Sequence, residues 1–315
     1  MSEPRIGVVG ATGAVGTVTL ELLAERGYRN VRAFASARSA GNEVAFGKRT
    51  LRVEEATPAA LTRDAFDLCL FSVGASTSRE LVPGAARAGV VCIDKSSVFR
   101  LEEGIPLVVP EVNGERALEH DGILANPNCC AVPLTCALKP LADGAGLRRL
   151  RVATYQSVSG AGARALERLR LQAPGEGDLA MDWSFDGEEF EEETKLREET
   201  RKILELPELP VSATCVRVPV AVGHAEAVWV ETEEPLGAEG ACELLAAAPG
   251  VRLAELPTPA DARGRDDVLV GRVRRDPTVE NGLALWVVCD NLRKGAALNA
   301  IQIAELVLAR QALPA

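Results

Sequence analysis

The sequence is poor in histidine: its 315 residues include only His120 and His224. Any mechanism that needs an imidazole must therefore use one of these two side chains. His120 lies between Glu119 and Asp121 in a polar stretch, which is typical of a solvated loop. Two histidines so far apart in the chain, without a cluster of cysteines and carboxylates, offer no set of metal ligands. We therefore expect no metal centre.

Paired cysteine spacings and long apolar runs are also missing. The eight cysteines are scattered without a C-x-x-C pair, which argues against a disulfide framework and a zinc site and indicates a reducing cytosol. No apolar run approaches the roughly 18–20 residues that span a bilayer. Because Met1 to Arg5 lead directly into an apolar run, we expect no secretion signal. These features predict a cytoplasmic protein that binds no membrane.

Basic charge is scarce as well. The net charge is −10 and the pI is near 5.0, and there is no basic stripe, so we expect no nucleic-acid partner. A content of 47% hydrophobic and 25% charged residues is that of an ordinary globular protein. The length predicts about two domains. An enzyme of anionic substrates with this net charge would need its arginines and lysines gathered locally.

A glycine-rich turn follows the first expected strand. The short run Arg5–Val9 leads into Gly10-Ala11-Thr12-Gly13-Ala14-Val15-Gly16, and a helical stretch extends from Thr17 to Arg26. A strand, a glycine turn and a helix form the phosphate-binding half of a dinucleotide site, with the pyrophosphate at the helix N-terminus. The spacing G-x-x-G-x-x-G is a variant of the commoner G-x-G-x-x-G pattern. The alternative is a tight turn without a ligand.

The end of the second expected strand favours NADP over NAD. Val31–Ala35 is followed by Ser36-Ala37-Arg38-Ser39, where an NAD site usually has a carboxylate for the ribose 2′-hydroxyl. A cation with two neighbouring hydroxyls suits a 2′-phosphate. A solvated loop charge is the alternative interpretation of Arg38.

The order of the expected elements predicts an α/β protein. Asp67–Val73 and Val90–Asp94 are typical of buried strands, and a helix, Glu80–Ala88, lies between them. This alternation indicates a Rossmann-type, doubly wound parallel sheet in the N-terminal part. Later strands, such as Arg149–Val158 and Ala225–Glu231, have few helices between them. They predict a second α+β domain with a mixed or antiparallel sheet.

Two further stretches carry expectations of their own. Leu107–Val112 is typical of extended chain, and Val211–Val222 of a long strand. Asp186–Leu206 is dense in charge, with Glu191 and Lys195 at i,i+4, which predicts a solvated helix.

The segment Asn126-Pro127-Asn128-Cys129 contains the strongest candidate nucleophile. A more helical run, Leu134–Leu141, follows it. A cysteine near a helix N-terminus meets backbone N–H groups and the positive end of the helix dipole, and both favour the thiolate. Pro133 predicts that the helix begins close to this proline, which would weaken the dipole argument. The alternative is a small buried hydrophobic residue.

Taken together, the motifs resemble those of the aspartate-β-semialdehyde dehydrogenases. Many motifs in one order are far more specific than any one of them. The matching motifs follow one another through nearly the whole chain: Gly10-Ala11-Thr12-Gly13, Arg38-Ser39, Ser96-Ser97-Val98-Phe99-Arg100, Val109-Pro110-Glu111-Val112-Asn113, Asn126-Pro127-Asn128-Cys129, Gln156-Ser157-Val158-Ser159-Gly160, Arg217-Val218-Pro219-Val220, Gly223-His224 and Asp290-Asn291-Leu292-Arg293-Lys294-Gly295.

The resemblance implies an NADP-dependent oxidoreductase. Its reaction would be the reductive dephosphorylation of L-aspartyl-4-phosphate to aspartate semialdehyde with NADPH, which feeds lysine (through diaminopimelate), threonine and methionine synthesis. Its partners would be this acyl phosphate or aldehyde and inorganic phosphate. Residues 1–126 with 292–315 would form the NADP-binding domain, and residues 127–291 the catalytic and dimerisation domain. The resemblance implies a homodimer or a dimer of dimers.

The resemblance also assigns roles to single residues. Cys129 would form the acyl-thioester, His224 would be the acid–base group, and Gln156 would orient the thioester. The substrate carboxylate would be bound by Arg217, its phosphate by Arg100, Asn128 and Lys195, and Glu192 would be a further substrate-site carboxylate. The positions that match the cofactor site are Gly10, Thr12, Gly13, Ala14, Val15, Arg38, Ser39, Ser159, Gly160 and Asn291.

Three features depart from the family's pattern: Pro133 four residues after Cys129, the second thiol at Cys130, and a short segment after Gln156. Cys130 stands where the family usually has serine or threonine. Only about forty residues separate Gln156 from Lys195, so the region that in the family contributes to the dimer is short. Arg217 and His224 are seven residues apart, a spacing that puts two side chains on opposite faces of a straight strand. A bend at Gly223 would bring both to one site.

Two other functions compete with this interpretation. N-acetyl-γ-glutamyl-phosphate reductase shares the fold and the cysteine–histidine chemistry on a longer acyl phosphate, but Asn128-Cys129 and Arg217-Val218-Pro219-Val220 favour the aspartyl enzyme. The second competing interpretation is a non-catalytic paralogue that only binds the dinucleotide. The joint presence of four site residues argues against it: Cys129, Gln156, Arg217 and His224.

Overall fold

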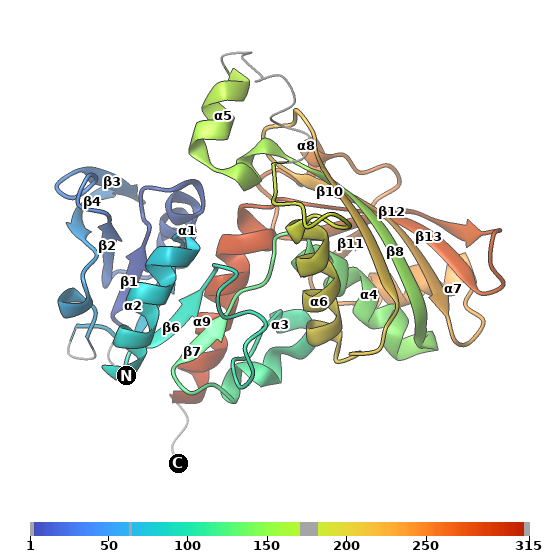
Figure 1. Cartoon of the computed structure of the whole chain (residues 1–315), viewed down its shortest axis with the longest axis horizontal. Coiled ribbons are helices and arrows are strands. Elements are labelled where there is room, and N and C mark those ends of the chain that lie inside the picture. The colour runs from blue at the N-terminus through green and yellow to red at the C-terminus, as the bar shows by residue number, and fades with distance from the viewer. Residues whose placement is uncertain (1–2, 63–64, 171–181, 312–315) are drawn as a thin grey trace. The chain divides into compact units, whose positions relative to one another are not determined.

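The computed structural model describes residues 3–62, 65–170 and 182–311. The chain forms two compact units, one of residues 1–127 with 296–315 and one of residues 128–295. Each unit has its own sheet (Figure 1). Within the described ranges, no helix has the length and apolar character needed to cross a membrane.

The first unit is built on a seven-stranded sheet in the order β3-β4-β2-β1-β5-β6-β7. Every neighbouring pair is parallel except β3 and β4, which form an antiparallel hairpin at one edge. The strands are β1 (Ile6–Val9), β2 (Val31–Ala35), β3 (Glu43–Phe46), β4 (Arg49–Glu55), β5 (Leu68–Phe71), β6 (Val91–Asp94) and β7 (Ile123–Ala125). The expected Rossmann-type parallel sheet is confirmed.

Helices alternate with these strands, as the sequence predicted. The main ones are α1 (Ala14–Glu25), α2 (Ala75–Arg87) and the C-terminal α9 (Leu298–Gln311); short turns are η1 (Pro58–Ala60), α3 (Pro110–Asn113) and η2 (Gly114–Leu118). Apolar side chains of α1 and α9 join those of the central strands in one core. The expectation of extended chain over Leu107–Val112 is wrong in its second half, because Pro110 opens α3 there, and proline suits the first turn of a helix.

The second unit is built on a six-stranded mixed sheet in the order β11-β12-β13-β10-β8-β9. Its centre is antiparallel, and each edge pair, β11–β12 and β8–β9, is parallel. The strands are β8 (Leu147–Gln156), β9 (Val211–Arg217), β10 (His224–Thr232), β11 (Val251–Leu253), β12 (Val268–Asp276) and β13 (Gly282–Cys289). The mixed second sheet is therefore confirmed.

The helices α4, α6 and α7 pack against this sheet (Figure 1). Along β8, buried side chains such as Leu150 and Val152 alternate with exposed ones such as Arg151 and Tyr155, so one face of the strand is covered and the other is open. The helices of the unit are α4 (Ala131–Ala145), η3 (Val158–Ala161), α5 (Ala163–Arg170), α6 (Glu191–Leu204), α7 (Ala238–Ala247), α8 (Pro259–Ala262) and η4 (Arg293–Ala297), the last reaching the border with the first unit.

The expectation of one strand over Val211–Val222 is wrong. β9 ends at Arg217, a connection runs to Gly223, and β10 begins at His224. Gly223 has a positive φ of 101°, and a Cβ there would lie 2.7 Å from the carbonyl oxygen of Pro259. Glycine therefore allows the chain to turn back into the sheet at this point. Two strands, and not one bent strand, bring Arg217 and His224 to one side.

Candidate active site

Cys129 lies two residues before the first residue of α4. Cys130 is the N-cap residue and Ala131 the first helical one, so the helix begins two residues before Pro133, close to this proline as expected. Pro133 occupies the first turn, where its missing N–H leaves no intrahelical hydrogen bond unmade. The side-chain oxygen of Asn128 accepts from the N–H of Cys130 at 2.8 Å. The thiol of Cys129 thus stands at a helix N-terminus, as the dipole argument requires.

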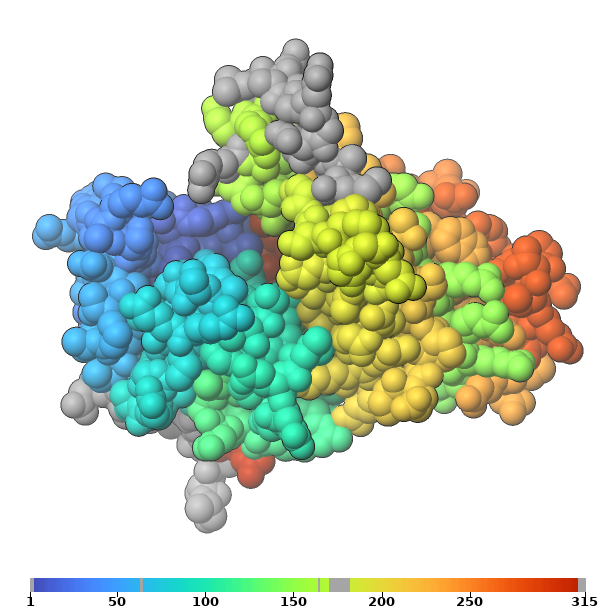
Figure 2. Space-filling model, in the orientation of Figure 1, coloured from blue at the N-terminus to red at the C-terminus, as the bar shows by residue number. Residues whose placement is uncertain are grey.

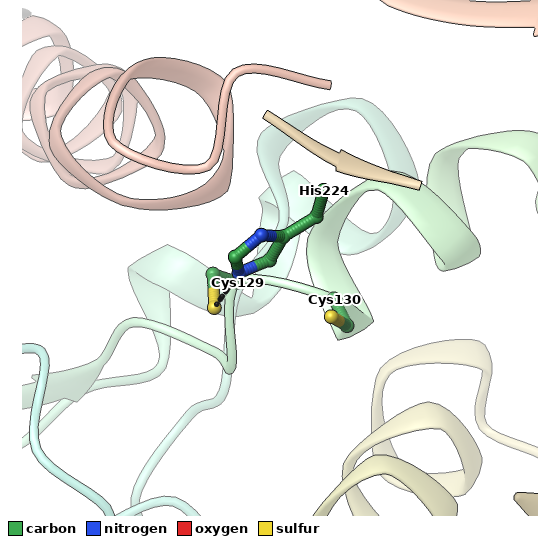
Figure 3. A group of neighbouring side chains, drawn as sticks. All are labelled: Cys129, Cys130 and His224. Carbon is green, nitrogen blue, oxygen red and sulfur yellow. Dashed lines mark hydrogen bonds between the residues drawn. The ribbon is translucent and has the colours of Figure 1, made fainter. Parts of the chain in front are cut away.

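The imidazole of His224 faces this thiol. Its Nε2 lies 3.2 Å from Sγ of Cys129 (Figure 3). The other ring nitrogen, Nδ1, lies 2.9 Å from the backbone nitrogen of Ser157. Because an amide N–H can only donate, Nδ1 must be the acceptor, and the proton of the neutral ring is on Nε2. The histidine therefore presents an N–H to the sulfur and to any group that reacts there.

Asn291 holds the backbone segments next to His224 in place through hydrogen bonds. Its side-chain oxygen accepts from the hydroxyl of Ser157 at 3.0 Å and from the N–H of Gly223 at 2.9 Å. Its amide nitrogen donates to the hydroxyl of Ser159 at 2.9 Å. Asn291 and Ser159, both predicted as cofactor residues, are buried and lie in the second unit, where they hold the two chain segments that flank His224.

Gln156, Arg217 and His224 share one face of the second sheet. Gln156 and Arg217 are register partners on β8 and β9. Thr154 on β8 and Glu226 on β10 are register partners. Gln156 lies two residues after Thr154 on β8, and His224 lies two residues before Glu226 on β10. Side chains two residues apart on a strand point to the same side, as do register partners. The sheet therefore gathers three residues that are far apart in the sequence.

The guanidinium of Arg217 is enclosed by groups of its own unit. Nη1 donates to the carbonyl oxygen of Ser157 at 3.0 Å, and Nε donates to the carboxylate of Asp182 at 2.9 Å. Nη2 also lies 2.9 Å from that carboxylate, and the ring of Trp183 stacks on the guanidinium carbon at 4.7 Å. A Cβ on Gly160 would approach Nη1 to 3.1 Å and the ring of His224 to 3.3 Å. Gly160, also predicted as a cofactor residue, thus lies between the guanidinium and the imidazole.

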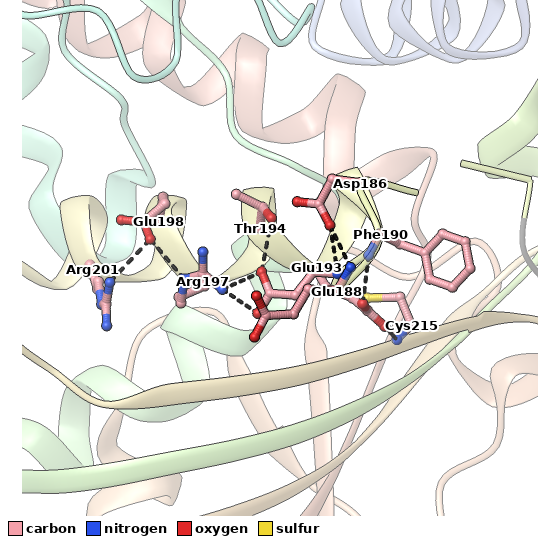
Figure 4. A network of polar contacts seen from close by, with 10 residues as sticks. Asp186, Glu188, Phe190, Glu193, Thr194, Arg197, Glu198, Arg201 and Cys215 are labelled. Atoms are coloured by element: carbon pink, nitrogen blue, oxygen red, sulfur yellow. Dashed lines mark hydrogen bonds and ion pairs between the residues drawn. The ribbon is translucent and has the colours of Figure 1, made fainter. Parts of the chain in front are cut away.

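The helix α6 has an acidic face that contacts the Cys129 segment. Glu192 accepts from the side-chain amide of Asn128 at 2.8 Å and from that of Gln156 at 3.1 Å. Glu199 accepts from the backbone N–H of Asn128 at 2.6 Å. Glu193 accepts from the N–H of Phe190 and of Cys215, both at 2.8 Å, which ties the start of the helix to β9 (Figure 4).

The interpretation of residues 186–206 as a solvated helix is therefore wrong for one of its faces. Glu192, Glu193 and Glu199 are at most 8% exposed. The outer face carries the expected ion pair, Lys195 with Glu191 at 2.7 Å. These carboxylates can be buried because N–H donors from β8, β9 and the Cys129 turn form hydrogen bonds with them.

The predicted phosphate ligands lie in both units. Asn128 and Lys195 are in the second, the former with its amide on Glu192 and the latter paired with Glu191. Arg100 is in the first unit and is buried, where it donates to the carbonyl oxygens of Asn126 at 3.0 Å and Lys95 at 2.6 Å.

Two buried acids lie next to Cys129. Burial raises the pKa of the Cys130 thiol well above its usual range, and the neighbouring Cys129 adds to this. Burial also raises the pKa of the Glu226 carboxyl, with a further contribution from the charge of Cys129. Neither carboxyl oxygen of Glu226 has a hydrogen-bond partner among the described residues. Cys129 is thus the half-buried thiol of the pair, and Cys130 is the fully buried and inert one.

The sequence argument against a metal assumed that no cysteines lie near a histidine, and the fold brings three such side chains together. The ligand atoms of Cys129, Cys130 and His224 lie within 4.8 Å of one another, although the histidine is distant in the sequence (Figure 3). Two sulfurs and an imidazole are ligands for a soft cation such as Zn²⁺. The raised pKa of Cys130 opposes the thiolate that such a site requires.

The first unit contains the predicted dinucleotide turn. Gly10 has a φ of 88°, and its missing Cβ would lie 2.2 Å from the carbonyl oxygen of Ser72. Gly16 allows an equally close approach, 2.1 Å, to the carbonyl oxygen of Gly10. Gly13 is the N-cap of α1 and makes no side-chain cap, so Ala14 and Val15 begin a helix whose first N–H groups face outward. Two glycines close the turn and the third opens the helix.

The remaining predicted cofactor residues of this unit lie near that turn. Thr12 and Arg38 are exposed and Ser39 is half buried. Arg38 and Ser39 directly follow β2, which is paired with β1, and β1 leads into the Gly10 turn. These positions are at the carboxyl edge of the parallel sheet, where ligands of such sheets bind.

Comparison with known proteins assigns the chain to a family. Two family profiles match it: the semialdehyde dehydrogenase NAD-binding domain over residues 5–120, and the semialdehyde dehydrogenase dimerisation domain over residues 138–184 and 182–294. A curated aspartate-semialdehyde dehydrogenase of Streptomyces akiyoshiensis is 46% identical, over 97% of this chain and 98% of its own length. The chain belongs to the aspartate-semialdehyde dehydrogenase family. The resemblance drawn from the motifs, and with it the prediction of an oxidoreductase, is confirmed.

Solved structures of the family have the same fold. Aspartate-semialdehyde dehydrogenase II of Vibrio cholerae, in complex with ASA, is 42% identical, covers 99% of this chain with the whole of its own, and superposes with a TM-score of 0.93. The enzyme of Candida albicans, solved with NADP, is 26% identical, covers 99% of this chain with the whole of its own, and gives a TM-score of 0.79. A nucleotide-binding domain of the NAD(P) type is therefore present in this chain.

Several residues of the site had not been singled out from the sequence. Ser157 lies within a motif that was recognised, so its role was within reach. Glu199 was hidden in a charge pattern typical of a solvated helix, and Glu226 in a strand. Asp182 and Trp183 have no periodic signal, and only the fold brings them to Arg217.

Proposed function

We propose that this protein reduces L-aspartyl-4-phosphate to L-aspartate-4-semialdehyde with NADPH, through an acyl-thioester on Cys129. The observation that carries the proposal is the 3.2 Å contact between Sγ of Cys129 and Nε2 of His224, with the N–H of Ser157 fixing the tautomer. A thiolate at a helix N-terminus beside an oriented imidazole is the arrangement that covalent acyl transfer requires.

The residues of the second unit perform the acyl chemistry. The thiolate of Cys129 attacks the acyl carbon, the bond from this carbon to the phosphate oxygen breaks, and inorganic phosphate leaves with the electron pair. The acyl group is then a thioester. Bound NADPH supplies the hydride for this carbon. His224 enters this step as the imidazolium, with its second proton on Nδ1 next to the hydroxyl oxygen of Ser157 at 3.0 Å. It donates its Nε2 proton to the oxyanion and takes the proton back when the carbon–sulfur bond breaks, which releases the aldehyde and restores the thiolate.

The substrate is held at both ends. Arg217 binds its α-carboxylate, since a guanidinium matches a carboxylate with two parallel hydrogen bonds. Asn128, Lys195 and Arg100 bind the phosphate, and Gln156 orients the thioester carbonyl. Glu192, which holds the amides of Asn128 and Gln156 at 2.8 and 3.1 Å, sets the position of both groups.

Residues 1–126 with 292–315, which include nearly all of the first unit, bind NADP. The missing Cβ atoms of Gly10 and Gly16 and the uncapped start of α1 fit a pyrophosphate. Around it lie Thr12, Gly13, Ala14 and Val15. Arg38 and Ser39 pair with the ribose 2′-phosphate, which NAD lacks. The family pattern also gives a role in cofactor binding to Ser159, Gly160 and Asn291, which belong to the second unit.

The catalytic unit also forms the dimer. One face of its sheet carries exposed or half-buried aromatic side chains: Tyr155, Trp229 and Trp286. The ring centroids of Tyr155 and Trp286 are 5.5 Å apart. Aromatic side chains of this kind are enriched at protein interfaces. We propose a homodimer or dimer of dimers that works in the cytoplasm, in the aspartate branch of amino-acid synthesis.

Phosphate-dependent reduction of NADP⁺ by aspartate semialdehyde tests the proposal, because the enzyme must also run in reverse. We expect activity in the wild type, little with NAD⁺, and nearly none in Cys129→Ser, which should still bind NADP. N-acetyl-glutamate semialdehyde is the comparison substrate. Faster turnover of that aldehyde would assign the chain to the reductase of N-acetyl-γ-glutamyl phosphate, and an inactive protein that binds NADP would indicate a paralogue.

A further inference from the structure

Three ligand atoms come together at the start of α4. The sulfur atoms of Cys129 and Cys130 and a ring nitrogen of His224 lie within 4.8 Å of one another (Figure 3). A tetrahedral Zn²⁺, with bonds of about 2.3 Å to sulfur and about 2.0 Å to nitrogen, holds its ligands about 3.5–4 Å apart. Small side-chain rotations are therefore enough for the three atoms to bind one ion.

Cys130 provides the ligand that the proposed reaction does not use. Cys129 and His224 alone are two ligands, and Cys130 adds a third at a position where the family usually has serine or threonine. A serine or threonine hydroxyl is not among the usual zinc ligands, whereas a thiolate is one of the commonest. The second thiol therefore gives this chain a set of ligands that the usual family pattern lacks.

A buried carboxyl lies beside these three ligands. Glu226 is 1% exposed, and neither of its oxygens has a hydrogen-bond partner among the described residues. It lies two residues after His224 on β10, so both side chains point to the same face of the sheet. Buried carboxyl groups normally have a partner. A divalent cation held by the neighbouring thiols would be the partner that this carboxyl lacks in the described part of the chain.

The surrounding groups fix these ligands in place. The helix α6, at the surface of the second unit (Figure 2, yellow), holds Asn128 through Glu199, whose carboxylate accepts from its backbone N–H at 2.6 Å. A cation that takes the lone pair of Nε2 of His224 leaves the ring proton on Nδ1. The hydroxyl oxygen of Ser157, 3.0 Å away, can accept that proton. A second hydrogen bond of this kind is what orients the histidine ligands of metal ions.

We propose that four side chains form a binding site for a soft divalent cation such as Zn²⁺: Cys129, Cys130, His224 and Glu226. The cation displaces the protons of the Cys130 thiol and the Glu226 carboxyl, which pass to solvent, because coordination deprotonates even a thiol that is otherwise protonated. Cys129 is half buried, so an ion can enter from its side. The bound ion occupies both the sulfur and Nε2, and it stops turnover until a chelator removes it.

A titration of the full chain with Zn²⁺ tests the site. The thiols are kept reduced, the buffer contains no phosphate, and a chromogenic chelator competes for the ion. We expect Cys130→Ser to raise the Kd of Zn²⁺ by more than about 100-fold, since loss of even an outer partner of a metal ligand costs about 10- to 100-fold. Cys242→Ser, which removes a second half-buried thiol, on α7, should bind Zn²⁺ like the wild type.

Turnover without added metal shows whether the variants are folded. Cys130→Ser should stay close to the wild type, because a hydroxyl is usual in the family at this position, and Cys130→Thr serves if the serine variant is inactive. Wild type that is first incubated with Zn²⁺ and then diluted into the assay should be inactive until a chelator is added. Cys130→Ser treated in the same way should be active at once.

Co²⁺ in place of Zn²⁺ identifies the ligands. At saturating metal, the thiolate-to-cobalt charge-transfer absorbance should be lower in Cys130→Ser and in Cys129→Ser than in the wild type. Glu226→Gln should weaken binding and leave this absorbance unchanged, because it removes an oxygen ligand and no sulfur.

The outcomes separate this site from the proposed function. An unchanged Kd in Cys130→Ser, or a wild type that does not compete with the chelator, would overturn the site. Equal inhibition of wild type and Cys130→Ser by Zn²⁺ would assign the inhibition to Cys129 and His224 alone and would also overturn it. A wild type that binds Zn²⁺ with the expected ligands and does not turn over aspartate semialdehyde would overturn the proposed function and support the metal site.

Discussion

The turn before α1 and the turn before α4 both deliver the chain from a parallel strand to a helix N-terminus, but they are held in different ways. Backbone groups close the first: the N–H of Gly13 donates to the carbonyl oxygen of Gly10 at 3.0 Å, and that of Gly10 to Phe34 at 2.8 Å. Side chains from distant positions hold the second, since Glu199 binds Asn128 across 71 residues of sequence.

The difference separates binding from chemistry. A backbone turn needs small residues at fixed places, and it offers N–H groups to a ligand that brings its own reactive atoms. The Cys129 turn must place one sulfur against one imidazole, so its position depends on α6 and β10. We therefore expect distant substitutions to affect turnover strongly when they touch the Cys129 turn, and to leave dinucleotide binding unchanged.

The largest effect should come from His224→Asn. The asparagine cannot exchange a proton with the thiohemiacetal oxygen, and we expect kcat to fall by about 10²–10⁴-fold, the usual contribution of general acid–base catalysis. Steady-state kinetics measure this, and the Kd of NADP should not change. Ser157→Ala is the matched control, because it keeps the N–H that binds Nδ1 and should cost much less. An unchanged kcat in His224→Asn would place the acid–base group elsewhere.

The next largest effect should come from Glu199→Ala. Loss of this carboxylate leaves the N–H of Asn128 without its 2.6 Å acceptor and frees the residue before the nucleophile. A misplacement of about 1 Å lowers turnover by about 10²-fold, and we expect a fall in kcat of this size. Glu199→Gln keeps an oxygen that can accept, so it should recover part of the rate. Equal rates in both variants and the wild type would show that the turn holds itself.

Gly16→Ala tests the other side of the comparison. A Cβ there would lie 2.1 Å from the carbonyl oxygen of Gly10, a backbone atom that cannot move without opening the turn. We expect a loss of about 1–3 kcal/mol in the free energy of unfolding, together with weaker NADP binding. Gly13→Ala is the control, since its Cβ would meet the same oxygen at 3.3 Å. Urea unfolding and NADP titration of the two variants measure the difference, and equal stability would contradict it.

The same contrast explains what the sequence could predict. The strand, the glycine turn and α1 follow one another within a short stretch, so the local pattern was sufficient. The helical run after Cys129 was expected only from Leu134, three residues late, because Pro133 was treated as an interior residue, and it lies in the first turn. The buried face of α6 was missed because the amides that satisfy Glu192 lie 36 and 64 positions away in the chain. The contact of Asp182 with Arg217 was missed for the same reason, because the two residues are 35 positions apart in the chain.

The smallest effect concerns Glu226, the buried carboxyl near Cys129. Burial raises the pKa of this side chain above that of a free glutamate, so the folded protein keeps a proton that the unfolded chain loses near pH 4.3. As the pH rises above that value, the unfolded state binds fewer protons than the folded state, and stability falls. Glu226→Gln is neutral at every pH. Its Tm, relative to wild type, should therefore rise between about pH 5 and about pH 8.

Glu54→Gln is the control for this titration. The partner Arg32 lowers the pKa of Glu54, which is therefore ionised in both the folded and the unfolded state over this pH range. Its Tm difference from wild type should stay constant with pH. A Glu226→Gln curve parallel to that of the wild type would mean that the Glu226 carboxyl is ionised in the folded protein.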